Sequence, residues 1–212
     1  WHIEGGFIHS GTKPLMPLDA LPVRGEHNAI NACAALAALA VAGFDADALV
    51  PHLRTFRPLP HRLQELGRRH DVLYVNDSIA TTPAAMLAAL ACYPDEPMAL
   101  ILGGYDRGLD WRDAMAHLAA SRLRLVCTQG ENGPRLAEML RKAGVAVREC
   151  DDIPTAVSLA SMAVQEGGVV LLSPGAPSFP VFRDYTERGR AFAAAAGFDP
   201  AAISAIEGME VA

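Results

Sequence analysis

Apolar and polar residues follow different periods in the first and second parts of this chain. Strand-like and turn-like residues come first, and two helix patterns follow, one over 28–42 and one that begins at Asp45 or Asp47. Pro58 and Pro60 then interrupt the pattern, because proline removes a backbone donor and disfavours helix in the preceding residue. We therefore predict two domains, over 1–58 and 59–212.

Beyond this boundary, short and nearly continuous apolar runs alternate with helix patterns. Apolar strands flanked by helices are typical of a parallel sheet that is covered on both faces. The sequence thus predicts an α/β fold, with a Rossmann-like, mostly parallel sheet preceded by a mainly helical segment. The predicted strands are 72–76, 98–102, 123–128, 145–149 and 169–173, and the predicted helices lie near 83–92, 111–119, 133–143, 154–165 and 182–196.

The composition is that of a soluble, core-forming protein, since 51% of the 212 residues are hydrophobic and 20% are charged. The net charge of −6 comes from interspersed acids and bases, so we expect neither nucleic acid nor a membrane as a partner. The longest apolar stretch, 32–44, is too short to span a bilayer. Cys33, Cys92, Cys127 and Cys150 include no C-x-x-C pair, so we expect buried free thiols in a reducing cytoplasm.

The N-terminal segment indicates that the chain is part of a longer protein. It begins with Trp1 rather than Met, and residues 1–6 alternate like a strand for which no partner is obvious nearby. We therefore expect a fragment.

Polar residues follow the first predicted strand of the second domain. Asp77 comes directly after it, and Thr81 and Thr82 precede Pro83, which suits the first turn of a helix. Hydroxyls at a helix N-terminus can bind an anion, and the carboxylate lies beside them. Asp77, Ser78 and Thr82 can equally be turn formers and a helix cap. The residues alone leave both interpretations open.

The next strand and the last strand also end in candidate loops. Gly103-Gly104 lets the backbone approach a ligand, and Arg107 offers a guanidinium for a carboxylate or phosphate. The glycines do not form G-x-G-x-x-G, so a dinucleotide site is poorly supported. Ser178 and the segment near Tyr185 follow the last strand, and they form either a binding loop or only a tight turn.

Three polar residues upstream of these strands are further candidates. Asn28 and Asn31 share one face of a starting helix and could present amide edges to a base, although Asn28 could instead cap that helix. Arg62 could contact a nucleotide or be a solvated linker charge.

In their order along the chain, these segments resemble the Mur ligase family, and in particular its glutamate-adding members. The resemblance covers nearly the whole chain. The matching segments are Gly25-x-His27-Asn28-x-x-Asn31, Leu59-Pro60-His61-Arg62, Asn76-Asp77-Ser78-x-Ala80-Thr81, Leu102-Gly103-Gly104, Leu172-Ser173-Pro174 with Ser178, and Glu187-Arg188-Gly189-x-x-Phe192.

The resemblance implies that 1–58 is the tail of the family's central ATP-binding domain and that 59–212 is its C-terminal glutamate-binding domain. The phosphate loop, the UDP-sugar domain and the usual Mg²⁺ ligands would lie outside this chain, so the fragment alone should not catalyse. By position, the residues that contact ATP would be Asn28, Asn31, Arg62 and Asp77, and those that hold glutamate would be Thr81, Arg107, Ser178 and Tyr185.

The implied reaction joins glutamate to UDP-N-acetylmuramoyl-L-alanine in peptidoglycan synthesis, with ATP and Mg²⁺, through an acyl phosphate. The resemblance further implies a cytoplasmic monomer, and a glutamate epimerase that acts in sequence with it. The rivals are a non-catalytic binding module with the Mur fold and a nicotinamide-dependent dehydrogenase domain.

Two departures bear on the stereochemistry of glutamate. Ile79 stands where D-glutamate ligases carry lysine, and Arg107 replaces the lysine usual after the Gly-Gly turn. The arginine guanidinium is planar and can bind a carboxylate through two parallel hydrogen bonds, whereas the lysine ammonium is a compact charge. The way in which glutamate is bound must therefore differ. The segments 79–83 and 106–111 resemble the smaller L-glutamate-adding branch. We therefore expect L-glutamate, with D-glutamate as the alternative.

Overall fold

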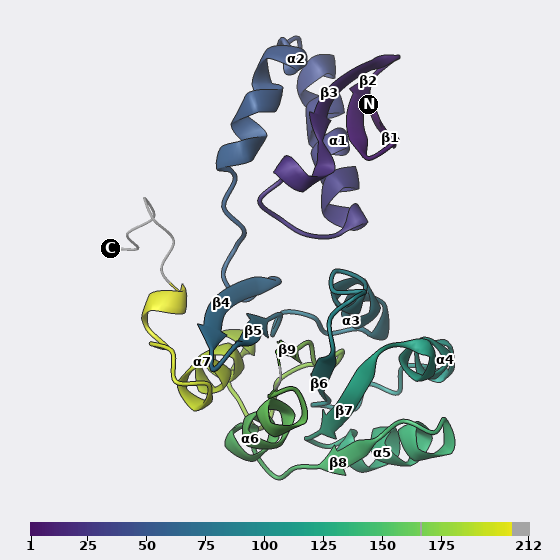
Figure 1. The fold of residues 1–212 in the computed structure, drawn as a ribbon, viewed down its shortest axis with the longest axis vertical. Helices are drawn as coiled ribbons and strands as arrows, with labels where there is room; N and C mark the ends of the chain where they lie inside the picture. Colours follow the sequence, from purple (N-terminus) through teal and green to yellow (C-terminus); the bar gives the residue numbers. More distant parts are fainter. Residues whose placement is uncertain (166, 205–212) are drawn as a thin grey trace. The chain divides into compact units, whose positions relative to one another are not determined.

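The computed structural model describes residues 1–165 and 167–204 (Figure 1). The described chain forms two compact units, Trp1–Pro58 and a second one that begins at Leu59. Each unit buries apolar side chains of its own, in one cluster in the first unit and in two clusters in the second.

The first unit packs helices against a small antiparallel sheet whose strand order is β1-β2-β3. Its core contains Ile8, Met16 and Leu36, which are almost fully buried. The N-terminal strand does have a neighbouring partner, contrary to expectation, because β1 pairs with β2 directly after it in the sequence. The elements are β1 (His2–Glu4), β2 (Phe7–Ser10), β3 (Lys13–Pro17), η1 (Leu18–Ala20), α1 (Glu26–Val41), α2 (Ala46–Leu49) and η2 (Val50–Thr55).

The predicted second helix of this unit is shorter than expected. Asp45 caps it as one of the two predicted candidates, since its carboxylate accepts a hydrogen bond from the Ala48 amide at 3.2 Å. After one turn, α2 gives way to the tighter 3₁₀ segment η2, near whose start lies Pro51. Proline lacks the amide hydrogen that a continuing α-helix would need.

The second unit contains a six-stranded sheet of order β4-β5-β9-β6-β7-β8, in which only β4 is antiparallel to its neighbour. The Rossmann-like, mostly parallel sheet is thereby confirmed. The elements are β4 (Gln64–Arg69), β5 (Val72–Asn76), α3 (Pro83–Leu90), β6 (Met98–Leu102), α4 (Arg112–Ala120), β7 (Leu123–Thr128), α5 (Gly133–Lys142), β8 (Val147–Glu149), α6 (Ile153–Ala163), β9 (Gly168–Leu172), α7 (Tyr185–Ala195) and η3 (Ala202–Ser204).

Helices cover both faces of this sheet, as Figure 1 shows. Strands β5, β6 and β9 are buried at every residue. Successive residues of a strand point to opposite faces, so Leu73 and Val75 pack with α3, α4 and α5, while Val72 and Tyr74 pack with α6 and α7. This burial on both faces explains the continuous apolar runs.

The antiparallel edge strand β4 is not apparent in the sequence. It consists of Gln64–Arg69, and most of its residues are exposed or half-buried, so it forms no apolar run. It pairs with β5 through a tight turn in which His70 and Asp71 both have positive φ, at 49° and 65°. A polar strand at a sheet edge is a common protection against pairing with other chains.

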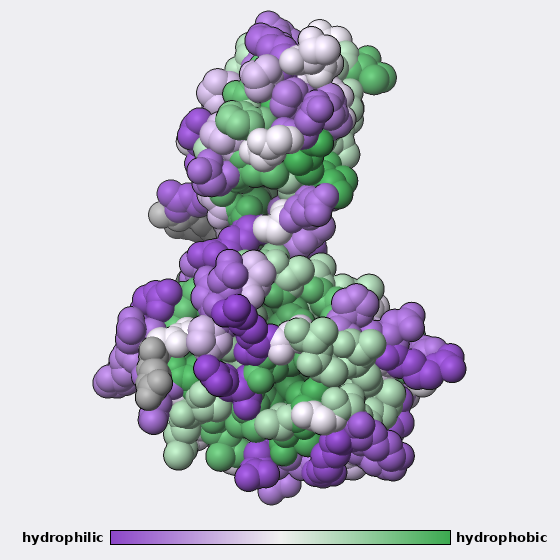
Figure 2. Space-filling view, turned by 45° about the vertical axis from the view of Figure 1, so that its right-hand side comes forward, coloured by the Kyte–Doolittle hydropathy of each residue, from purple (hydrophilic) through white to green (hydrophobic). Residues whose placement is uncertain are grey.

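The surface and the cysteines agree with the composition. On the face shown in Figure 2, hydrophilic and hydrophobic residues are interspersed over each unit. All four cysteines are free and buried, as predicted. Among the described residues, no helix has both the length and the apolar character that crossing a membrane would require.

Candidate functional site

The carboxyl ends of the central strands bring the predicted loops together at one edge of the sheet. The Asp77 amide donates to Leu172 O at 2.8 Å, which joins the loop after β5 to the end of β9. The Gly103 amide donates to Pro174 O at 2.9 Å, which joins the loop after β6 to the loop after β9. This edge is where parallel α/β sheets bind ligands.

Asp77 is buried between two of these segments. One carboxylate oxygen accepts from the Leu63 amide at 3.1 Å, and the other accepts from the Ser173 hydroxyl at 2.7 Å. Burial raises the pKa of Asp77 to about 6, although the two hydrogen bonds and the nearby charge of Arg62 act in the opposite direction. Asp77 therefore organises the site as well as offering it a carboxylate.

The segment before β4 has an unusual backbone, which Asp77 helps to hold. His61 and Leu63 have φ values of 63° and 43°, in the left-handed region that side chains disfavour. The His61 ring is buried, and its Nδ1 atom accepts from the amide of Asn76 at 2.8 Å. Burial, followed by the charge of Arg190, lowers the pKa of His61, so the ring is neutral in this position. Arg62 itself is exposed.

The start of α3 supports the helix-cap interpretation for one of its two threonines. Thr82 is the N-cap residue, and its hydroxyl accepts from the Ala85 amide at 3.3 Å. Pro83 occupies the first turn, as predicted. Thr81, the predicted glutamate-binding residue, precedes the cap and is half-buried.

The two glycines after β6 are required by the close packing of neighbouring loops, which the sequence did not reveal. A Cβ atom at Gly103 would overlap the carbonyl oxygen of Gln129, and one at Gly104 would overlap that of Pro177. Gly103 also has a φ of 101°. Close packing of the neighbouring loops thus requires glycine at both positions, and the approach of this backbone to a ligand stays a prediction.

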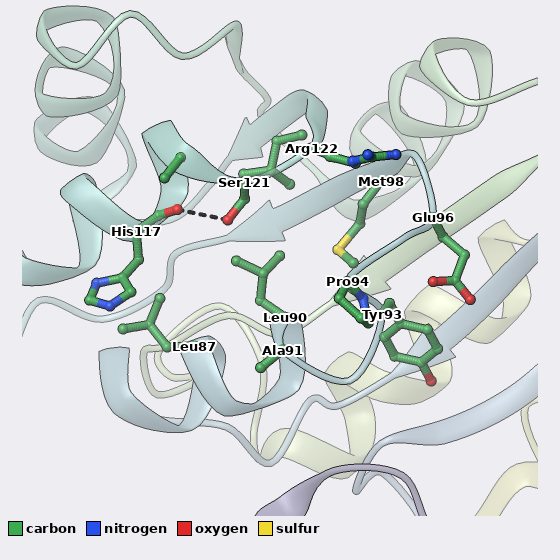
Figure 3. Close-up of a pocket in the computed structure, with 12 residues that line it drawn as sticks. Leu87, Leu90, Ala91, Tyr93, Pro94, Glu96, Met98, His117, Ser121 and Arg122 are labelled. Atoms are coloured by element: carbon green, nitrogen blue, oxygen red, sulfur yellow. Dashed lines mark hydrogen bonds between the residues drawn. The ribbon is translucent and has the colours of Figure 1, made fainter.

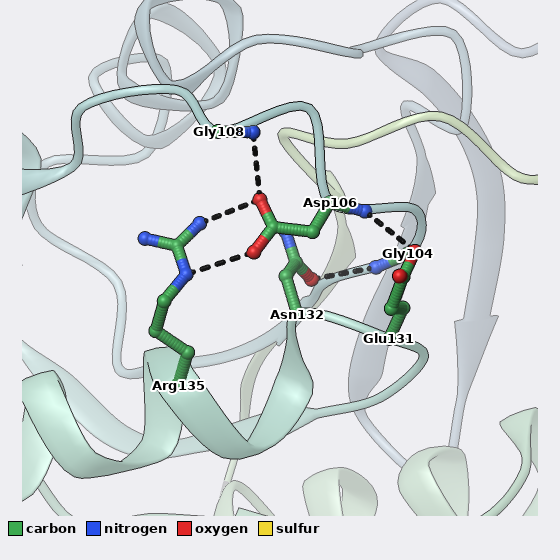
Figure 4. A network of polar contacts seen from close by, with 6 residues as sticks. All are labelled: Gly104, Asp106, Gly108, Glu131, Asn132 and Arg135. Atoms are coloured by element: carbon green, nitrogen blue, oxygen red, sulfur yellow. Dashed lines mark hydrogen bonds and ion pairs between the residues drawn. The ribbon is translucent and has the colours of Figure 1, made fainter.

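The loop that carries Arg107 is fixed by residues at the start of α5 (Figure 4). Arg135 donates to both carboxylate oxygens of Asp106, at 2.9 and 2.8 Å, and holds the pKa of that carboxyl below its usual value. The Asn132 side chain accepts from the Gly104 amide at 3.0 Å. The described part of the chain offers Arg107 no hydrogen bond or ion pair, and its side chain is exposed.

The loop after β9 and the start of α7 contain the two remaining predicted glutamate residues. Ser178 is buried, whereas the Tyr185 side chain is 39% exposed. Asp184 caps α7 by accepting from the Glu187 amide at 2.8 Å. The Ser78 hydroxyl donates to the Tyr185 carbonyl oxygen at 2.8 Å, which connects the loop after β5 with the first residue of α7.

Arg188 is the residue whose position the sequence did not predict. It is 1% exposed, and it donates to Ser78 and to the carbonyl oxygen of Ala176. The matching segment Glu187-Arg188-Gly189 was the only signal, because nothing in the helix pattern distinguishes Arg188 from the exposed Arg190.

Two pockets lie at opposite ends of the strands. One of about 350 Å³ is lined by Gly103, Gly104, Gln129, Ser178 and Arg188, among others, at the carboxyl ends. Another of about 410 Å³ lies near the first residues of β6 and β7, between Leu87, Leu90 and His117 (Figure 3). The second pocket contains none of the predicted site residues.

Asn28 and Asn31 belong to the first unit. Asn28 is the third residue of α1, and its amide donates to Arg24 O at 2.6 Å, while Gly25 occupies the N-cap position. The alternative that Asn28 is the cap is therefore wrong. Asn31 lies one turn further and is exposed.

The described residues contain one cluster of three side chains that could hold a metal ion, and it does not suit Mg²⁺. Among them, only His2, Glu4 and His9 group closely enough to hold a metal, on the strands β1 and β2. Two imidazoles and one carboxylate do not match the oxygen ligands that Mg²⁺ prefers.

The fold and these loops define a Rossmann-like α/β domain with a polar site at the carboxyl ends of its strands. Residues 61–175 match the family model of the Mur ligase, glutamate ligase domain. The chain belongs to the Mur ligase family.

Similar proteins carry the same name in several bacteria. A relative from Xanthomonas campestris is 51% identical over the whole chain, one from Xylella fastidiosa is 45% identical over the whole chain, and one from Micromonospora is 37% identical over 89% of it. Each is named UDP-N-acetylmuramoyl-L-alanine–L-glutamate ligase. The chain spans about half the length of these relatives, at 46%, 46% and 43%.

Solved structures share the fold. A UDP-N-acetylmuramate-alanine ligase from Thermotoga maritima has a TM-score of 0.62 at 21% identity, over 82% of this chain and 38% of its own. A MurF ligase from the same organism, in complex with ADP, has a TM-score of 0.54 at 18% identity, over 81% of this chain and 38% of its own.

Proposed function

We propose that the full-length protein containing this chain is an ATP-dependent ligase that joins L-glutamate to UDP-N-acetylmuramoyl-L-alanine in peptidoglycan synthesis. The observation that carries this proposal is the 51% identity, over the whole chain, to a relative named for that substrate pair. The ADP complex of a structural neighbour supports ATP as the phosphoryl donor.

The proposed reaction has two steps. The carboxylate of UDP-N-acetylmuramoyl-L-alanine attacks the terminal phosphorus of ATP, and ADP leaves, which yields an acyl phosphate. The amine of glutamate then attacks the acyl carbon, loses a proton, and phosphate leaves as the C–N bond forms. The contribution of a domain like this one would be to hold the amine in line for attack.

The proposed domain assignment gives 1–58 to the end of the central domain and 59–212 to the glutamate-binding domain. In support, the described chain divides into compact units between Pro58 and Leu59. We assign ATP contacts to Asn28, Asn31, Arg62 and Asp77, and glutamate contacts to Thr81, Arg107, Ser178 and Tyr185.

The glutamate assignment is supported by how these residues are presented. Arg107 is exposed on a loop that Asp106 and Arg135 fix, so its guanidinium is available to a carboxylate. Ser178 lies in the loop after β9, and hydrogen bonds from Arg188 and Ser78 hold that loop and the start of α7.

Phosphate release by the full-length protein tests the proposal. With ATP, Mg²⁺ and UDP-N-acetylmuramoyl-L-alanine present, we expect L-glutamate to stimulate release strongly and D-glutamate weakly. A preference for D-glutamate would show that Ile79 and Arg107 are tolerated variations in the usual ligase. If neither amino acid stimulates phosphate release, the proposed ligase activity is refuted.

Arg107→Ala is expected to raise the KM for glutamate about 10- to 100-fold, because a hydrogen bond to a charged group contributes roughly 1.5–3 kcal/mol. The KM for ATP should change little. Arg124→Ala is a matched control. Arg124 is also exposed, but it lies near the first residue of β7, away from the carboxyl ends of the strands where the candidate site lies. Equal changes in both KM values would remove Arg107 from the glutamate site.

We further propose that the protein acts as a monomer in the cytoplasm and that a glutamate epimerase acts on the product. A ligase that adds L-glutamate would leave an L-centre in the peptide, so a separate inversion would be needed wherever the wall contains D-glutamate.

A further inference from the structure

Arg188 is a buried charge that has only neutral partners. Its Nε atom donates to the Ser78 hydroxyl at 3.1 Å, and Nη2 donates to the carbonyl oxygens of Ser78 and Ala176 at 2.8 and 3.0 Å. Its Nη1 atom is buried and has no partner. Burial lowers the pKa of Arg188 to about 9, which still leaves the side chain cationic at neutral pH.

The described part of the chain supplies no counter-charge for this guanidinium. No described carboxylate forms an ion pair with Arg188, and the buried Asp77 uses its two oxygens for Leu63 and Ser173. An unpaired buried charge is costly. Strongly perturbed, unpaired groups of this kind are common where a ligand completes the site.

The position of Arg188 links it to the proposed glutamate residues. Ser78, which accepts from Arg188, donates in turn to the carbonyl oxygen of Tyr185. Ala176, its other acceptor, lies two residues before Ser178 in the same loop. Arg188 and Ser178 also line the same pocket of about 350 Å³. The guanidinium of Arg188 therefore contacts the loops that we assign to the amino-acid substrate.

We propose that Arg188 is a positioning residue that holds the Ser178 loop and whose buried positive charge selects an amino-acid substrate with an acidic side chain. The proposal rests on the proposed ligase function. The substrate carboxylate supplies the missing counter-charge through space, since Coulomb attraction at a given separation is several times stronger in a protein environment than in bulk water. A neutral isostere such as glutamine gains none of this attraction.

The first test replaces the charge and measures discrimination in the full-length enzyme. For Arg188→Met we expect the KM for glutamate to rise about tenfold more than the inhibition constant of glutamine, because both ligands lose the hydrogen bonds that hold the Ser178 loop but only glutamate loses the attraction of the charge. Arg188→Lys keeps the charge and should retain most of the preference for glutamate over glutamine. Equal weakening of both ligands by Arg188→Met would show a purely structural role and overturn the inference.

A second pair of variants leaves Arg188 in place, so it decides the question even if Arg188→Met does not fold. Ala191 lies three residues further along α7, on the same face, and lines the same pocket. Ala191→Glu would bring a protein counter-charge close to Arg188, whereas Ala191→Gln has nearly the same shape and no charge. We expect a KM for glutamate several-fold higher in Ala191→Glu than in Ala191→Gln, and a similar inhibition constant of glutamine in both.

Equal glutamate KM values in the Ala191 pair would overturn the inference about Arg188. That failure is distinguishable from a failure of the proposed function. If wild-type enzyme releases phosphate in response to glutamate, the ligase function stands whatever the variants show. If wild type does not respond to glutamate, both proposals fall together.

Discussion

Gly189→Ala is expected to destabilise the second unit by about 3 kcal/mol or more. Gly189 is buried in α7, and a Cβ atom there would overlap Nδ1 of His61 and approach the Asn76 amide to 2.9 Å. The His61 ring cannot move aside cheaply, because Asn76 and Ser204 hold it at 2.8 and 3.2 Å. Helix α7 would have to shift away from β5. Urea unfolding followed by circular dichroism measures the loss.

Gly133→Ala is the matched control for this prediction. Gly133 is also a buried glycine in a helix, but a Cβ atom there would meet its nearest neighbour, the Thr128 carbonyl carbon, at an ordinary 3.6 Å. Alanine favours helix over glycine by up to about 1 kcal/mol, so Gly133→Ala should be neutral or stabilising. If Gly189→Ala unfolds at the same urea concentration as Gly133→Ala, the close packing of α7 on His61 is not required.

The buried strands of the second unit could be predicted closely because burial on both faces leaves a continuous apolar run. The runs at 72–76, 98–102 and 123–128 coincide with β5, β6 and β7. The edge strand β4 could not be predicted, since Gln64–Arg69 is stabilised by pairing with β5 rather than by apolar contacts of its own. Pairing partners are a tertiary property that a local pattern does not contain.

The candidate site was predictable only in outline, from the rule that ligands bind beyond the carboxyl ends of parallel strands. That rule selected Asp77, Arg107 and Ser178, which do lie in the loops that follow β5, β6 and β9. It could not assign partners: Arg135, from the next helix, pairs with Asp106, and Arg188 lies buried against Ser78. Such contacts depend on how separate loops meet, which residue type and spacing do not specify.

Asp77→Asn is expected to stabilise the protein above pH 6 and to remove one pH dependence of its stability. Burial raises the folded-state pKa of Asp77 from 3.8 to about 6, so the folded chain holds this proton more tightly than the unfolded chain. The stability contributed by the protonated carboxyl is therefore fully present below pH 4, approximately the unfolded pKa, and is lost as the pH rises through about 6. A shift of this size corresponds to on the order of 3 kcal/mol.

Asparagine suits this test because it keeps the local hydrogen bonds. Its amide oxygen can accept from the Leu63 amide, and its NH₂ group can donate to the Ser173 hydroxyl. Burial lowers the pKa of His61 in both proteins, so the difference between wild type and variant isolates Asp77. Urea unfolding from pH 4 to pH 8 should show that difference growing with pH. A difference that is independent of pH would contradict the raised pKa.

The same variant separates the structural role of Asp77 from its proposed role at ATP. A buried carboxylate that lowers stability at neutral pH is expected where its charge serves function, because functional sites often sacrifice stability for activity. If that charge contacts ATP, Asp77→Asn at pH 8 should raise the KM for ATP on the order of tenfold while the fold becomes more stable. An unchanged KM for ATP in a more stable protein would limit Asp77 to holding Leu63 and Ser173 in place, and the nucleotide contacts would then have to come from other residues.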